Sequence, residues 1–219
     1  MGLSAFKYLS DLGVALTVVV TRNSEDFNGR ANARFGTEGV DYIAATRTKL
    51  LVMDNNDPSR TRDIIAAALP KTDILLNCAV RRSDLPKHRM EYLIDRAMVR
   101  AMRTSSIICD CTACDRDMIE TCTSSAFLYH SYREEGVVHY NCDHIPSIVA
   151  HTATQLLTES TFAYIRYITN SKSLQAFLEN EDLRNGVCCC GGHLTHALSA
   201  EKKGLPYRRL NEAILDPCS

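Results

Sequence analysis

The sequence lacks the features that would assign it to several simple functional classes. Its 219 residues carry a net charge of −1 and a pI near 6.6, so no charge excess attracts nucleic acid or an anionic membrane. No apolar run approaches the roughly 18 residues that a membrane-spanning helix needs. Residues 1–13 lack the basic start and long apolar stretch of a signal peptide. We therefore expect neither nucleic-acid nor membrane partners.

The chain has ten cysteines but little sign of a disulfide framework. Cys188, Cys189 and Cys190 are consecutive, which suits disulfide pairing poorly. Other cysteines lie inside apolar, strand-like runs, where a free thiol packs as a small hydrophobic group. Reduced cysteines indicate a cytoplasmic protein.

A complete zinc-binding pattern is also missing. Structural zinc sites usually combine two Cys-x-x-Cys knuckles, or one knuckle with two spaced histidines. Cys109, Cys111, Cys114 and Cys122 supply one knuckle at most, and Cys109 and Cys111 would share one face of a strand. We predict packing and no metal, with a thiol- or metal-dependent binding module as a remote alternative.

Apolar segments typical of buried strands alternate with helical segments over residues 1–148, which predicts an α/β fold with a parallel sheet. After this point the pattern is helical throughout, so we expect one domain over 1–148 and a C-terminal helical segment over 149–219, which would complete a substrate domain. The expected strands are 15–20, 40–45, 73–80, 106–111 and 137–142. The expected helices are 4–12, 23–35, 58–69, 87–103, 149–168, 174–183 and 194–203.

A doubly wound nucleotide-binding sheet usually carries the motif Gly-x-Gly-x-x-Gly after its first strand, and this sequence does not contain the motif. Gly2 could be the last glycine of such a motif, or only the small residue that often follows an initiator methionine. After the strand at 15–20, Thr21, Arg22 and Asn23 stand where an NAD enzyme usually has a carboxylate for the ribose. Arg22 could instead hold a 2′-phosphate, which predicts a preference for NADP, or it could be an ordinary loop arginine.

The segment at 106–154 reads as strand, polar loop, strand and helix, and ligands in such sheets bind at the carboxyl ends of strands. The loop hydroxyls at 121–125 could bind a carboxylate, or the whole loop could be a solvated surface. His139 alternates into a strand face and is expected to be a satisfied core residue. The polar residues at or beyond predicted strand ends are Asp110, Asp115, Asp117, Glu120, Thr121 and His144.

Four segments resemble the family of alanine dehydrogenase, nicotinamide nucleotide transhydrogenase and saccharopine dehydrogenase: DILLNCAV (73–80), MRTSSIICDCTACDRDMIET (102–121), GVVHYNCDHIPSIVAHTAT (136–154) and GGHLTHALSAEKKGLPY (191–207). Asp-His-x-Pro-Ser at 143–147 is most similar to the carboxyethyl-ornithine synthase branch. The resemblance implies a Rossmann-like doubly wound sheet and an NAD(P)-dependent oxidoreductase acting on CH–NH bonds of amino acids. The reaction would be oxidative deamination, or reductive condensation of a 2-oxo acid with an amino acid, in a homo-oligomer.

Site residues follow from the same resemblance. Asp115 would be the catalytic acid, although the spacing around it differs from the family pattern by one residue on each side. The family's loop glycines are replaced by Arg116, Asp117 and Met118. The cofactor-binding residues implied by the resemblance or by the strand positions are Gly2, Thr21, Arg22, Asn23, Ala79, Val80, Cys114, Cys142, His144 and Ile145.

One departure concerns the amino-terminal side of the chain. Family members carry an N-terminal substrate domain and a first Rossmann strand, and neither is recognised in this sequence. That strand lies mid-sheet between the second and fourth strands, so its removal would leave two backbone edges unpaired. A truncated or degenerate, non-catalytic dinucleotide-binding homologue is therefore the alternative to an enzyme.

Overall fold

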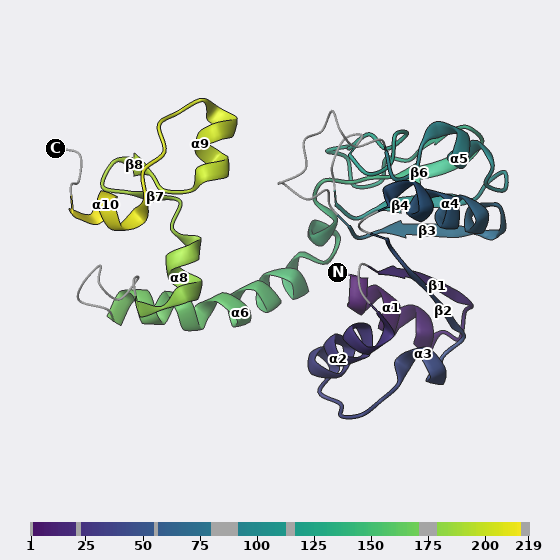
Figure 1. Ribbon diagram of the computed structural model, residues 1–219, viewed down its shortest axis with the longest axis horizontal. Coiled ribbons are helices and arrows are strands. Elements are labelled where there is room, and N and C mark those ends of the chain that lie inside the picture. Colours follow the sequence, from purple (N-terminus) through teal and green to yellow (C-terminus); the bar gives the residue numbers. More distant parts are fainter. Residues whose placement is uncertain are drawn as a thin grey trace. The chain divides into compact units, whose positions relative to one another are not determined.

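The computed structural model describes residues 2–20, 23–54, 57–79, 92–112, 117–170 and 179–215 (Figure 1). Its contacts divide the chain into one unit over Met1–Ile148 and a second over Val149–Ser219. None of the helices in these described ranges has the length and apolar character needed to cross a membrane.

The first unit begins with a small parallel sheet covered by helices. β1 and β2 pair in parallel, with Leu16 opposite Thr48 and Val20 opposite Val52. A core of buried side chains, including Phe6, Phe27 and Tyr42, packs against this pair. The elements are α1 (Gly2–Asp11), β1 (Leu16–Val20), α2 (Ser24–Phe35), α3 (Tyr42–Ala45) and β2 (Thr48–Val52).

Local sequence signals explain the ends of these helices. The side chain of Asn23 accepts a hydrogen bond from the amide of Asp26 at 2.9 Å and so caps α2. Gly36 ends α2 in the left-handed conformation, with φ of 67°. Asp57 caps α4 (Pro58–Ala68), which has proline in its first turn.

The second sheet of this unit contains four strands in the order β3-β4-β6-β5. β3, β4 and β6 run parallel, and β5 pairs antiparallel with β6 at the edge. Ile108 and Val137 are fully buried in a core that includes Val99 and Leu69. The elements are β3 (Ile74–Asn77), α5 (Arg96–Arg100), β4 (Ile107–Asp110), β5 (Tyr132–Glu134) and β6 (Val137–Tyr140), with a 3-10 turn η1 (Leu69–Lys71) after α4.

Helices dominate the second unit. α6 is one continuous helix with no buried side chain among its described residues (Figure 1). A short antiparallel pair of strands follows, and Gly204 closes α9 in the left-handed conformation. The elements are α6 (Ala150–Asn170), α8 (Glu181–Gly186), β7 (Cys189–Cys190), β8 (His193–Leu194), α9 (Ala197–Lys203) and α10 (Leu210–Leu215), and the 3-10 turn η3 (Ile145–Val149) precedes them.

The α/β fold with a parallel sheet and C-terminal helices is confirmed, but three element predictions were wrong. The expected strand at 40–45 is helix α3, because Asp41 accepts hydrogen bonds from the amides of Ile43 and Ala44 and caps it. The strand expected at this point lies later in the chain and is β2 (Thr48–Val52). Of the helix expected over 87–103, residues 87–91 lie outside the described residues; in the described part Ile94 pairs with Ile119, and the helix α5 covers only Arg96–Arg100.

The third error concerns burial. Residues 15–20 were expected to form a strand buried on both faces, yet Thr17 and Val19 of β1 are exposed. The helices of this unit cover only the face that carries Leu16, Val18 and Val20.

Candidate functional site

The carboxyl ends of β3, β4 and β6 lie side by side because the three strands are parallel neighbours. In open α/β sheets this edge is where ligands bind. The last residues of β3 and β4, Asn77 and Asp110, are directly opposite each other, and Asn141 follows β6 immediately. All three polar side chains are buried.

A hydrogen-bond network joins these strand ends. Asn77 Nδ2 donates to Asp110 Oδ1 at 3.0 Å, and the same oxygen accepts from the amide and hydroxyl of Thr112 at 2.9 and 2.6 Å. Asn77 Oδ1 accepts from the amide of Ala79 at 3.1 Å. Oriented to satisfy both its polar atoms, the Asn141 amide donates to the Asp110 carbonyl and accepts from the Ser124 amide, both at 3.3 Å.

This network has a structural consequence for the edge. The buried Asp110 side chain accepts from Asn77, at the end of β3, and from Thr112, after β4, while Asn77 accepts from the amide of Ala79. The backbone just after β3 and just after β4 is therefore fixed relative to the sheet. The polar groups of Asn77, Asp110 and Asn141 form hydrogen bonds within the protein, whereas Ala79, two residues after Asn77, is exposed. We call Asn77, Asp110 and Asn141 the strand-end network.

Sequence reasoning placed Asp110 at a strand end but overlooked Asn77 and Asn141. The sequence carries a signal for both asparagines, because each directly follows a strand-like run: Asn77 follows ILL (74–76) and Asn141 follows VVHY (137–140). Buried amides at such positions need partners, and neighbouring strand ends are the nearest source.

The predicted cofactor residues that are described fall at two places on this edge. Gly2 begins α1 beside the end of β3, since a Cβ atom added to it would lie 3.7 Å from Cβ of Cys78. Cys142, His144 and Ile145 follow β6, where Cys142 is buried and the other two are half-buried. Asn23 lies after β1, where it caps α2. Thr21, Arg22, Val80, Cys114 and the predicted catalytic Asp115 lie outside the described residues.

Several other polar residues that were predicted at or beyond strand ends form hydrogen bonds that stabilise the fold. Thr121 is buried and its hydroxyl hydrogen-bonds His139 Nε2 at 2.8 Å, so it was wrongly grouped with hydroxyls available to a carboxylate. His139 Nδ1 lies 3.1 Å from the Val137 carbonyl, and burial lowers its pKa, which confirms it as a satisfied core histidine. Glu120 accepts from the amide of Arg96 at 2.8 Å, just before α5.

Thiols gather at the same edge. Sγ of Cys109 lies 3.8 Å from Sγ of Cys111, which confirms that the two side chains share a face. The hydrogen bond between them lowers the pKa of Cys109 and raises that of Cys111 to about 11, and a hydrogen bond to Cys111 also raises the pKa of Cys78. Burial raises the pKa of Cys122 to about 12. Among these four thiols the pKa is lowered only for Cys109, which makes Cys109 the most readily ionised of them.

One set of potential metal ligands occurs among the described residues. The ligand atoms of Cys142, Asp143 and His144 lie within 4.8 Å of one another. Two of them already contact each other, His144 Nδ1 with Asp143 Oδ1. Three consecutive residues supply three donors, one fewer than a structural zinc site uses.

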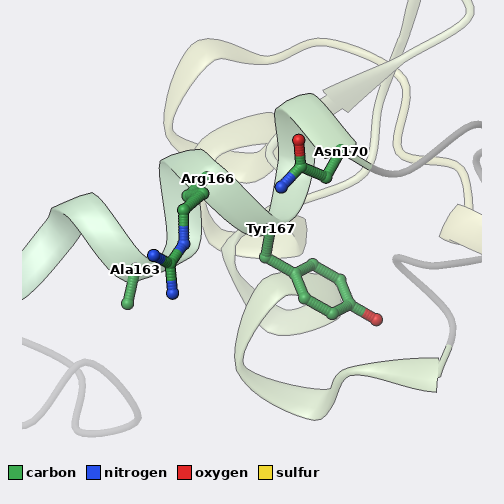
Figure 2. A pocket seen from close by; sticks show the side chains of 4 residues that line it. All are labelled: Ala163, Arg166, Tyr167 and Asn170. Carbon is green, nitrogen blue, oxygen red and sulfur yellow. The ribbon is translucent and has the colours of Figure 1, made fainter.

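Two hollows among the described residues lie on α6, and neither is lined by a residue of the strand-end network. One of about 340 Å³ lies on α6 and is lined by Ala163, Arg166, Tyr167 and Asn170. Figure 2 shows the Arg166 guanidinium beside Ala163, whereas the Tyr167 ring points away from Arg166. A shallow hollow on one helix offers few convergent polar groups, so the strand ends remain the better candidate site.

The residues at the strand ends fit a dinucleotide. Small or side-chain-free positions, Gly2 and Ala79, adjoin the edge and allow close approach of an extended ligand. The amino end of α1 lies at this edge, where unsatisfied amides favour a phosphate.

The chain is similar in sequence to known proteins that belong to one family. The profile of the family described as "Alanine dehydrogenase/PNT, C-terminal domain" matches residues 1–197. An alanine dehydrogenase of Methanococcus maripaludis is 32% identical over 151 residues, which are 68% of this chain and 39% of that protein. One of Bacillus subtilis is 31% identical over 156 residues, 71% of this chain and 40% of that protein.

Solved structures show the same likeness. An L-alanine dehydrogenase structure superimposes with a TM-score of 0.68 at 25% identity, covering 93% of this chain and 50% of that one. A transhydrogenase from Sinorhizobium meliloti has a TM-score of 0.59 at 16% identity, covering 84% of this chain and 46% of that one, and shows the fold alone. The chain thus spans about 40% of the length of the curated relatives that it matches.

Proposed function

The chain belongs to the alanine dehydrogenase/PNT family, and from this membership we propose that it supplies the dinucleotide-binding part of an oxidoreductase acting on amino acids. The observation that carries the proposal is the strand-end network, which fixes three adjacent carboxyl ends of a parallel sheet beside the start of α1. Residues 1–148 would bind the nucleotide, and residues 149–219 would complete a substrate domain.

A bound nicotinamide would supply or accept the hydride at a CH–NH bond. The chain's own residues bind and orient the ligand. The amino end of α1 at Gly2 would accept the phosphates, and the exposed backbone at Ala79 would line the ligand. Cys142, His144 and Ile145, just after β6, would lie beside the nicotinamide. Asp115 would act on the substrate amine or an attacking water.

Two finer proposals concern cofactor and substrate. Arg22 supports NADP over NAD, because a guanidinium can form charge-assisted hydrogen bonds to a 2′-phosphate. The Asp-His-x-Pro-Ser segment at 143–147 supports reductive condensation of a 2-oxo acid with an amino acid rather than simple deamination. A homo-oligomer in the cytoplasm is the expected setting.

The test is a fluorescence titration of the chain with NADPH and with NADH. We expect saturable binding, with NADPH the tighter ligand. Arg22→Ala should weaken NADPH binding by about tenfold or more, the loss of one charge-assisted contact, and leave NADH unchanged. Tighter NADH binding by the unmodified chain would overturn the NADP proposal.

A steric variant tests the location. Ala79→Leu should weaken both nucleotides, because it places a large side chain on the proposed ligand path. Ala67→Leu makes the same change at an exposed position of α4 and should bind normally. If neither nucleotide binds the unmodified chain, the proposed dinucleotide-binding function is overturned; binding without turnover supports the non-catalytic dinucleotide-binding alternative. Turnover with alanine and NAD(P)⁺, compared with pyruvate, an amino acid and NADPH, separates deamination from condensation.

A further inference from the structure

Three half-buried cysteines at the carboxyl ends of β3 and β4 take no part in the proposed nucleotide binding. Cys109 lies within β4, Cys111 follows the last residue of β4, and Cys78 follows the last residue of β3. Because β3 and β4 are parallel with Asn77 opposite Asp110, the residues that come next, Cys78 and Cys111, are also neighbours. The three thiols therefore form one cluster at this end of the sheet.

Within the cluster, Cys109 and Cys111 are close enough to bond after a small movement. Their Sγ atoms are 3.8 Å apart, which leaves no room for another atom between them, and bonded sulfur atoms are about 2.05 Å apart. Cys109 is held inside the sheet, where it pairs with Tyr140 of β6. Cys111 lies beyond the last residue of β4, so the movement that closes the gap falls on the end of the strand.

Hydrogen bonds give the thiols of the cluster different chemical roles. The bond from the Cys111 thiol lowers the pKa of Cys109, although burial acts in the opposite direction, and raises the pKa of Cys111 to about 11. A hydrogen bond with Cys111 raises the pKa of Cys78 as well. Because the thiolate is the form that attacks a disulfide, Cys109 is the nucleophile of the cluster.

Cys111 is placed to complete a reaction that Cys109 begins. Once Cys109 is bonded to another sulfur it carries no negative charge, so the hydrogen bond that raises the pKa of Cys111 is lost. Both thiols are half-buried, whereas Cys122 is buried in the core. A lowered pKa, access to solvent and a neighbouring thiol are the three properties that redox-active cysteines share.

We propose that Cys109 and Cys111 form a redox-active dithiol, which small-molecule disulfides such as oxidised glutathione convert to an intramolecular disulfide. The Cys109 thiolate attacks one sulfur of the reagent, forms a mixed disulfide and releases one glutathione thiolate. Cys111 then loses its proton and attacks Sγ of Cys109, which releases the second glutathione thiolate. The two protein thiols are thereby oxidised by two electrons, and the reagent is reduced to two glutathione thiols, which take up the released protons.

Mass spectrometry of the full chain treated with oxidised glutathione tests the dithiol. Free thiols are blocked with N-ethylmaleimide after the reaction, and trypsin releases residues 104–116, which contain Cys109, Cys111 and Cys114. We expect this peptide to lose two hydrogen atoms and to regain them when dithiothreitol is added before blocking. Fragment ions that separate Cys111 from Cys114 should place the loss at Cys109 and Cys111.

The same digest contains an internal control. Residues 117–133 carry the buried Cys122 as their only cysteine. This thiol should still be free when the Cys109–Cys111 disulfide is complete, because burial raises its pKa to about 12 and shields it from the reagent.

Two serine variants assign a separate step to each thiol. Cys111→Ser keeps a hydrogen-bond donor beside Cys109 but cannot form the second bond, so glutathione should remain attached to Cys109. Cys109→Ser removes the nucleophile and should slow the modification of Cys111 by about tenfold or more. Cys188→Ser, at an exposed position of the second unit, should leave the reaction unchanged, and far-ultraviolet circular dichroism shows whether each variant is folded.

Three results would overturn the proposal. The first is that Cys109 and Cys111 remain free after the exposed Cys188 has reacted fully. The second is a disulfide that joins Cys78 to either thiol in place of the expected bond. The third is a folded Cys111→Ser chain in which no glutathione accumulates on Cys109.

Discussion

Removal of the Asp110 side chain should destabilise the sheet edge of the first unit. It is 1% exposed, and one of its oxygens accepts three hydrogen bonds, from Asn77 and from the amide and hydroxyl of Thr112. Asp110→Ala removes this acceptor and leaves the Asn77 amide buried beside a cavity.

The magnitude follows from the number and kind of these bonds. A hydrogen bond to a charged group contributes about 1.5–3 kcal/mol, but bonds that share one oxygen are not additive. Leaving a buried donor unsatisfied costs about 1–3 kcal/mol, and with several donors sharing one acceptor we expect Asp110→Ala to cost about 2–4 kcal/mol. Asp110→Asn keeps an acceptor oxygen and should cost about 1–2 kcal/mol, because its NH₂ group replaces an acceptor.

Urea unfolding followed by far-ultraviolet circular dichroism measures the effect, and this signal needs no tryptophan, which the chain lacks. Asp73→Ala is the control, because Asp73 is exposed and pairs with Arg103 at 2.9 Å; it should change the unfolding free energy by about 0.5 kcal/mol or less. A similarly small effect of Asp110→Ala would show that the strand-end network does not stabilise the sheet edge.

Three further predictions concern other parts of the structure. Thr121→Val leaves Nε2 of the buried His139 without its partner and should lower the free energy of unfolding by about 1–3 kcal/mol, whereas the same change at the exposed Thr123 should be nearly neutral in urea unfolding. Hydrogen bonds from Arg100 and Arg96 lower the pKa of Glu135 from 4.5 to about 2, so its stabilisation is complete above pH 4.5 and is lost toward pH 2. The thermal midpoint of Glu135→Gln should therefore lie below that of the unmodified chain at neutral pH and converge with it in acid, and a constant difference would refute the ion-pair origin. Because Cys111 lowers the pKa of Cys109, iodoacetamide should label Cys109 faster than Cys111 or Cys122, and Cys111→Ala should slow that labelling in peptide mass spectra; an unchanged rate would contradict it.

Local signals in the sequence were enough to predict much of the secondary structure. Asn23 and Gly36 bracket α2, and Asp57 with Pro58 starts α4, because caps and fixed backbone angles act within one helical turn. Parallel strands were also predictable, since apolar runs bounded by turns are typical of β3, β4 and β6. The strand at 40–45 failed because a capping aspartate, Asp41, outweighed a short apolar run.

The candidate site was predictable in outline only. Strand ends were recognised from chain order, whereas the residues after β6 were named from the family resemblance. The strand-end network was not, because Asn77 and Asp110 are 33 positions apart and meet only through the register of β3 with β4. Thr121 looked like a ligand-binding hydroxyl until its contact with His139 placed it in the interior.

By itself, then, the sequence determined several helix ends, the parallel strands and the family resemblance, because these depend on short segments and on their order. Only the tertiary structure decided which polar groups are consumed by the fold and which remain exposed. These outcomes depend on burial and on contacts between distant segments, and a buried polar group must find its partner wherever the packing places one.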